Sequence, residues 1–194
     1  MKPIARLLSF SLAIVAVASA AAAFQVYGEI GKKWQSLGGE SGFLGAPLND
    51  ESGTPDGVGR YNHFQHGSIY WTPKTGAHEV HGAIRDKWEL LGWERSVVGY
   101  PVTDELTTPD KVGRYVHFQS GSIYWTPKTG AHEVHGAIRD AWAAKGWERS
   151  ALGYPTSDEL KDGAARRSNF EHGFIYWTKV GGAVVHGPVK FDDN

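Results

Sequence analysis

Two histidines and a glutamate, His78, Glu79 and His81, form the first pattern in this 194-residue chain that suggests chemistry. The pattern returns as His132, Glu133 and His135. Zinc proteases hold their metal with two histidines at positions i and i+4 of a helix and use a glutamate as general base. Here the histidines stand three positions apart on a predicted strand, which directs their rings to opposite faces. We therefore expect no metal site and assign these residues a structural or ligand-contacting role.

Adjacent carboxylates form a second pattern, which occurs three times: Asp50 and Glu51, Asp104 and Glu105, and Asp158 and Glu159. A glycosidase needs two carboxylates in unlike environments, so that their pKa values separate. Neighbouring residues on a turn or strand point apart, which favours solvated or backbone-capping carboxylates over a hydrolytic pair. The chain also lacks cysteine and a Gly-x-Ser-x-Gly elbow. The sequence thus predicts no catalytic residues and no cofactor.

Aromatic residues form the third pattern, with eight tryptophans and eight tyrosines in a small chain. Sugar rings pack on aromatic faces, and arginine side chains donate hydrogen bonds to sugar hydroxyls. The candidate ligand-binding residues are Arg60, Tyr61, Tyr70, Arg114, Tyr115, Tyr124, Arg167 and Tyr176. We assign to the core the tryptophans Trp34, Trp88 and Trp142 of predicted helices and Trp71, Trp125 and Trp177 of predicted strands.

These candidates belong to a repeated segment. Residues Gly59 to Trp88 return as Gly113 to Trp142 with three differences, at Asn62, His66 and Lys87 of the first copy. A more divergent copy runs from Ser168 to Gly187. Such repetition indicates one supersecondary unit packed against copies of itself. Weak identical sites on one body would gain affinity for a polymer through multivalency.

Each copy contains signals for one helix and one β-hairpin. Ile84, Trp88 and Leu91 follow the spacing i, i+4 and i+7 of an amphipathic helix, which Gly92 is well placed to end. Before this helix, period-two alternation on either side of a Pro-Lys-Thr-Gly turn predicts a hairpin. We expect Ile69 and Trp71 to face the core and Tyr70 to face outward.

A tetrapeptide follows each helix: LGAP at 44–47, VGYP at 98–101 and LGYP at 152–155. In register with the helices, these tetrapeptides resemble the LGFP repeat, a family of secreted and cell-envelope proteins. The resemblance covers nearly the whole chain after residue 23. In mycolate-bearing actinobacteria such repeats are appended to wall-modifying enzymes such as mycolyltransferases and amidases. The resemblance implies that this chain is a non-catalytic wall-associated module, with arabinogalactan as a proposed ligand. Tyr100 and Tyr154 keep an aromatic third letter, whereas Ala46 does not.

The predicted fold class is α+β, with three tandem helix-plus-hairpin repeats at about 26–79, 80–133 and 134–190 in one compact, pseudo-symmetric domain, 24–194. The repeats could close into a ring-like body or stack openly.

Thr54, Pro55, Asp56 and Gly57 predict a turn that returns in the second copy. The third copy lacks Thr-Pro-Asp, as a terminal repeat can.

The N-terminus has the plan of a secretory signal peptide, residues 1–23, with Lys2 and Arg6 before an apolar run and alanines at its end. The formal net charge is −1, without a basic stripe typical of nucleic-acid binding. We therefore expect a secreted, wall-associated protein that binds cell-wall polysaccharide, arabinogalactan or peptidoglycan, and neither nucleic acid nor, after cleavage, the membrane. Envelope proteins stay open as partners. The alternatives are a cell-wall hydrolase, of glycosidase or amidase type, and a structural or protein-binding spacer.

Overall fold

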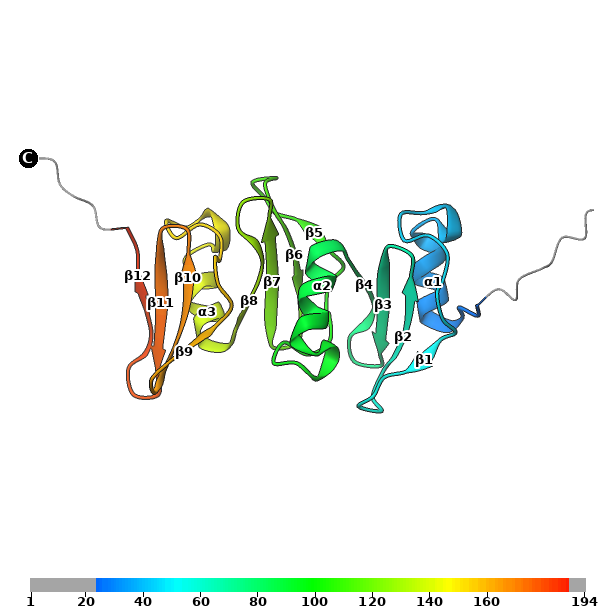
Figure 1. Cartoon of the computed structure of the whole chain (residues 1–194), viewed down its shortest axis with the longest axis horizontal. Helices are drawn as coiled ribbons and strands as arrows, with labels where there is room; N and C mark the ends of the chain where they lie inside the picture. The colour runs from blue at the N-terminus through cyan, green and yellow to red at the C-terminus, as the bar shows by residue number, and fades with distance from the viewer. Residues whose placement is uncertain (1–23, 189–194) are drawn as a thin grey trace, which may run out of the picture.

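A computed structural model describes residues 24–188 as three similar units arranged in a row (Figure 1). The predicted signal peptide, residues 1–23, and the last six residues lie outside the described part. Each unit consists of one α-helix, one 3-10 turn and one four-stranded antiparallel sheet. The predicted fold class and the three tandem repeats are thus confirmed.

The elements have the following bounds. The first unit contains α1 (Gly28–Ser36), η1 (Gly39–Ser41), β1 (Ser52–Gly53), β2 (Arg60–Phe64), β3 (Gly67–Thr72) and β4 (Gly76–His81). The second contains α2 (Gly82–Leu91), η2 (Trp93–Arg95), β5 (Leu106–Thr107), β6 (Arg114–His117), β7 (Gly121–Thr126) and β8 (Gly130–His135). The third contains α3 (Gly136–Ala144), η3 (Trp147–Arg149), β9 (Leu160–Asp162), β10 (Ala165–Phe170), β11 (Gly173–Thr178) and β12 (Gly182–His186).

The predicted helix forms where the apolar spacing placed it. In α2, Ile84 and Trp88 are buried, and Gly92 adopts a left-handed conformation, with φ of 102°, that ends the helix. The indole of Trp88 donates a hydrogen bond to the carbonyl oxygen of Gly99 in the tetrapeptide, at 3.2 Å. The helix is thereby tied to the turn that follows it.

The predicted hairpin is β3–β4, which β2 and the short β1 extend into a sheet with the order β1-β2-β3-β4. The expectation that Tyr70 faces outward is wrong, because Ile69 and Tyr70 are 0% and 3% exposed. Both faces of the sheet are covered, one by α1 and the other by α2 of the next unit. Successive side chains of β3 therefore point to opposite faces of the sheet, and both of these faces are buried.

Helices and sheets alternate along the molecule. Helix α2 contacts both β3 and β4 of the first sheet and β7 and β8 of the second, and α3 has the same place between the second and third sheets. The described chain begins at one end of the row and ends at the other (Figure 1). The units therefore stack openly and do not form a ring.

The tetrapeptide aromatic residue locks each unit to the previous one. Gly99 has φ of 76°, and a Cβ there would lie 2.8 Å from Oε1 of Gln119. The adjacent Tyr100 hydroxyl reaches the preceding unit, 2.8 Å from Oγ1 of Thr54 and 2.7 Å from Oδ1 of Asp56. The Thr-Pro-Asp turn thus provides the hydrogen-bond partners of the next unit's tyrosine.

No helix within residues 24–188 is both long enough and apolar enough to span a bilayer.

Candidate functional site

Three equivalent pockets lie at the N-terminal ends of the three helices, and we call them the helix-end pockets. Their volumes are about 260, 410 and 240 Å³ in the first, second and third units. Each pocket is lined by the first residues of the helix, one glutamate, one arginine and one tryptophan. These side chains are Glu51, Arg60 and Trp71; Glu105, Arg114 and Trp125; and Glu159, Arg166 and Trp177.

Strand register brings each arginine beside its tryptophan. Arg114 of β6 is directly opposite Trp125 of β7, and residues opposite each other on paired strands share one face of the sheet. Arg60 and Trp71 form the same pair in the first sheet. Each indole is half-buried, and the Arg114 side chain is 39% exposed. An aromatic surface and a guanidinium group are therefore both open to a ligand.

A mostly buried glutamate orients each arginine. Nε of Arg114 donates to Oε1 of Glu105 at 3.0 Å, and the Glu105 side chain is only 7% exposed. Arg60 and Glu51 form the corresponding ion pair, whereas Nε of Arg166 and Oε1 of Glu159 are 3.7 Å apart. Of the terminal nitrogens, Nη1 of Arg114 also donates to Oγ1 of Thr107 at 3.3 Å, and Nη2 of Arg60 donates to the carbonyl oxygen of Glu51 at 3.2 Å. The remaining N–H groups of each guanidinium are available to a ligand.

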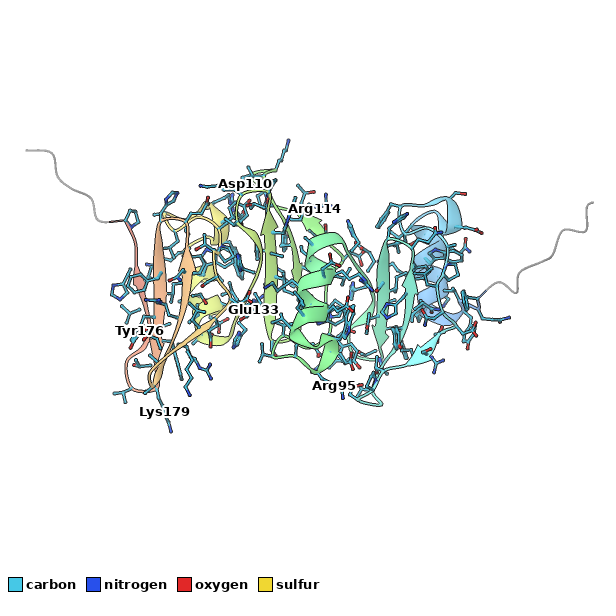
Figure 2. The ribbon with its side chains drawn as sticks, viewed as in Figure 1. Arg95, Asp110, Arg114, Glu133, Tyr176 and Lys179 are labelled. Carbon is cyan, nitrogen blue, oxygen red and sulfur yellow. The ribbon has the colours of Figure 1, made fainter. Side chains whose placement is uncertain are left out.

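A histidine joins the pocket of the second unit to the first unit. Nδ1 of His81 lies 2.8 Å from Oε2 of Glu79, and Nε2 lies 3.3 Å from Oε1 of Glu105. The hydrogen bond with Glu79 raises the pKa of His81, and burial raises the pKa of Glu105. His135 bridges Glu133 and Glu159 in the same way, with Glu133 between the second and third units (Figure 2).

The histidines of the metal-like pattern have separate partners. His78 lies 3.2 Å from Oδ1 of Asp104 through Nδ1 and 3.0 Å from the carbonyl oxygen of Thr75 through Nε2. His81 instead lies between two glutamates. Within residues 24–188, no group of three His, Cys, Asp or Glu side chains is arranged to hold a metal ion. Both histidines serve the joint between units.

Four of the five predicted tyrosines, Tyr61, Tyr70, Tyr115 and Tyr124, lie in the joints and away from the helix-end pockets. Tyr70 stacks on Tyr61 at 5.2 Å between ring centroids, and Trp93 of the next unit lies 5.9 Å from Tyr70. Tyr124 is 2% exposed in the second joint and stacks on the half-buried Tyr115. The expectation that Tyr70 and Tyr124 offer an exposed ligand surface is therefore wrong, because the next unit covers them.

Strand pairing in the third sheet shows that Arg166, and not the predicted Arg167, is the counterpart of Arg60 and Arg114. Arg166 is opposite Trp177, whereas Arg167 is opposite Tyr176, so Arg166 takes the place of Arg60 and Arg114. Arg167 and Tyr176 lie together on the face of this sheet that no fourth unit within the described residues covers. The Arg167 guanidinium is 5.8 Å from the Phe174 ring. The pocket arginine of the third unit is thus Arg166, one position before the predicted Arg167.

Sequence reasoning identified two of the pocket arginines and missed the tryptophans and glutamates. A signal was present, because Arg60 and Trp71 stand equally far from the ends of β2 and β3, where Phe64 pairs with Gly67. Counting back from this turn pairs each arginine with a tryptophan. The core assignment is confirmed for Trp88 and Trp142, which are 0% exposed. Trp34, Trp71, Trp125 and Trp177 are partly buried and pack against the core, and the last three also line a pocket.

Comparison with known families agrees with this three-unit structure. The model of the LGFP repeat matches three consecutive segments, residues 44–96, 98–150 and 152–190, which together make up most of the chain. No match was found among curated proteins. Each matched segment starts at the apolar first residue of one tetrapeptide and runs through the sheet that follows it, and the first two segments continue through the next helix. By this match, the chain belongs to the LGFP repeat family.

Proposed function

We propose that this protein is a non-catalytic module that binds envelope polysaccharide, arabinogalactan or peptidoglycan, through its helix-end pockets. Its LGFP repeats indicate a cell-envelope-associated repeat protein. One observation carries the proposal: the same tryptophan, arginine and glutamate line a pocket in all three units. The terminal units differ from the middle unit at their joint residues, yet they keep this set.

The pocket chemistry suits a sugar ring. The half-buried indole of Trp125 offers an apolar face for the C–H groups of a sugar, and the exposed nitrogens of Arg114 can donate to its hydroxyls. Glu105 neutralises the guanidinium charge, which favours a neutral, hydroxyl-rich ligand over a polyanion. Each pocket is small and half-open, so one site alone binds weakly, and several sites on one protein gain by avidity on wall polymers.

The carboxylates near the pocket support a structural role over a hydrolytic one. Glu79 uses Oε2 for His81 and accepts the backbone N–H of Glu105 with Oε1, at 3.0 Å. Glu105 in turn accepts from Arg114. The first unit has Tyr27 where His81 stands, so the histidine bridge is not part of every pocket. Zymography on wall material tests the alternative, because a hydrolase would clear a band that a binding module leaves intact.

The proposal is tested by co-sedimentation of the purified protein with insoluble cell walls, with albumin as the control. We expect the protein to pellet with the walls and to be released by excess soluble arabinogalactan or by peptidoglycan fragments. Whichever of the two releases it identifies the ligand. Recovery equal to that of albumin contradicts the proposal. Retention on an envelope protein but not on glycans would instead favour the spacer.

A further inference from the structure

The helix-end pockets alternate between the two long edges of the molecule. Each pocket lies beside the short first strand of its sheet, since Arg60 pairs with Gly53 of β1, Arg114 with Thr107 of β5 and Arg166 with Lys161 of β9. Figure 1 shows β1 and β9 at the lower edge and β5 at the upper edge. Arg114 lies at the upper edge as well (Figure 2).

The chain path explains this alternation. Each unit crosses the molecule five times: through its helix, through the connector that contains the tetrapeptide and the short strand, and through three antiparallel strands. An odd number of crossings leaves the chain at the edge opposite to the one where the unit began. The next helix therefore starts at the other edge, and its pocket with it.

The joints between units fix this arrangement. β4 ends at His81 and α2 begins at Gly82, so no linker separates two units. The joint buries Tyr70 against Trp88, with ring centroids 4.6 Å apart, and Nε of Arg85 donates to Oγ of Ser68 at 2.7 Å. Because the joints are packed in this way, the units cannot rotate to bring all three pockets to one edge. The pocket of the second unit therefore stays on the edge opposite to the pockets of the first and third units.

We propose that the protein bridges two polysaccharide chains, one along each edge. This inference rests on the proposed function of the pockets. The pockets of the first and third units share the lower edge and can hold one chain together, while the pocket of the second unit holds another chain at the upper edge. A module with all its sites on one edge would coat a single polymer. This one links two neighbouring polymers.

The test is light scattering of the soluble polysaccharide that releases the protein from walls, arabinogalactan or peptidoglycan, as the protein is added. Binding to each polysaccharide is measured separately by affinity electrophoresis. Two matched variants narrow single pockets at exposed positions in the first turn of a helix: Ala83→Leu in the second unit and Ala137→Leu in the third. Ala83→Leu removes the only upper site among the described residues. Ala137→Leu leaves one site on each edge.

We expect the wild-type protein to cross-link the polysaccharide and to scatter light strongly. Ala83→Leu should lower the scattering at least fivefold while binding persists through the lower edge, and Ala137→Leu should retain most of it. Binding without scattering by the wild-type protein overturns the bridging inference and leaves the proposed function intact. Equal scattering by the two variants also overturns it. Absence of binding in electrophoresis both to arabinogalactan and to soluble peptidoglycan contradicts the proposed function itself.

Discussion

The hydroxyl of Tyr100 in the second unit donates a 2.7 Å hydrogen bond to Oδ1 of Asp56 in the first unit. Tyr154 repeats this contact with Asp110 across the second joint, at 2.6 Å. The first unit has no predecessor among the described residues and carries Ala46 in place of the tyrosine. The third has no successor there and lacks Thr-Pro-Asp. The first unit thus lacks the tyrosine, and the third lacks the aspartate turn that would accept one. In each case the missing group would have no partner among the described residues.

Removing this hydroxyl should weaken the first joint. We expect Tyr100→Phe to lower the free energy of unfolding by about 1 kcal/mol, as for loss of one typical hydrogen bond. Urea denaturation measures this change. Ala46→Tyr is the matched control, and it should add no stability because no Thr-Pro-Asp turn precedes it. Equal stability of Tyr100→Phe and wild type would show that this contact does not hold the units together.

A second contact makes the first joint sensitive to acid. Asp104 accepts from Nζ of Lys33 at 2.6 Å and lies near His78. Burial alone would raise the pKa of Asp104, but hydrogen bonds from His78 and Lys33 lower it to about 2. A lowered carboxyl pKa gives stability that is present above the unfolded value of 3.8 and is lost as the pH falls toward 2.

Asp104→Asn should therefore melt at a lower temperature than wild type at pH 7. The two melting temperatures should converge as the pH approaches 2, where Asp104 itself becomes protonated. Thermal melts across this pH range measure the difference. A gap that stays constant from pH 7 to pH 2 would mean that the charge of Asp104 does not stabilise the joint.

Two neighbouring arginines provide a matched pair for the pocket. Arg166→Gln should weaken binding to wall polysaccharide several-fold, because the shorter amide carries no charge and reaches less far into the pocket beside Trp177. Arg167→Gln should leave binding unchanged, because Arg167 lies on the other face of β10. Affinity electrophoresis compares them. The reverse order of effects would place the ligand on the outer face of the third sheet.

The stacked units should tolerate one more copy. Insertion of a second copy of residues 80–133 after Glu133 supplies both halves of each joint, so we expect a longer folded chain with a larger urea m-value, since m rises with the surface exposed on unfolding. The insertion should also raise the unfolding midpoint. A lower midpoint than that of wild type would contradict the account of the joints.

The sequence predicted the repeated elements well, because Ile84, Trp88 and Gly92 form a local pattern whose helix needs little tertiary information. It failed at Tyr70, because alternation along a strand tells which residues share a face and not what covers that face. The next unit covers it here. The sequence predicts Arg167 as the third arginine because the third copy has lost the Thr-Pro-Asp turn, and only strand pairing shows that Arg166 is the equivalent residue.

Trp93 shows another property that sequence patterns do not reveal. Its φ of 58° lies in the left-handed region, which is unfavourable for a bulky residue, and Trp147 has φ of 60° at the same position. The first unit has Gly39 there, with φ of 58°. The Trp93 ring packs on Tyr70, with the Arg85 guanidinium 5.1 Å from its centre, and this joint packing offsets the backbone strain.

The central claim is tested most directly by calorimetric titration of the protein with the soluble polysaccharide that releases it from walls, arabinogalactan or peptidoglycan. The wild-type protein is compared with a variant that carries Arg60→Gln, Arg114→Gln and Arg166→Gln, and a thermal melt verifies that the variant is folded. Binding through the helix-end pockets predicts saturable heat for the wild type and at least a tenfold weaker affinity for the variant. A folded variant that binds this polysaccharide as tightly as the wild type would contradict the claim.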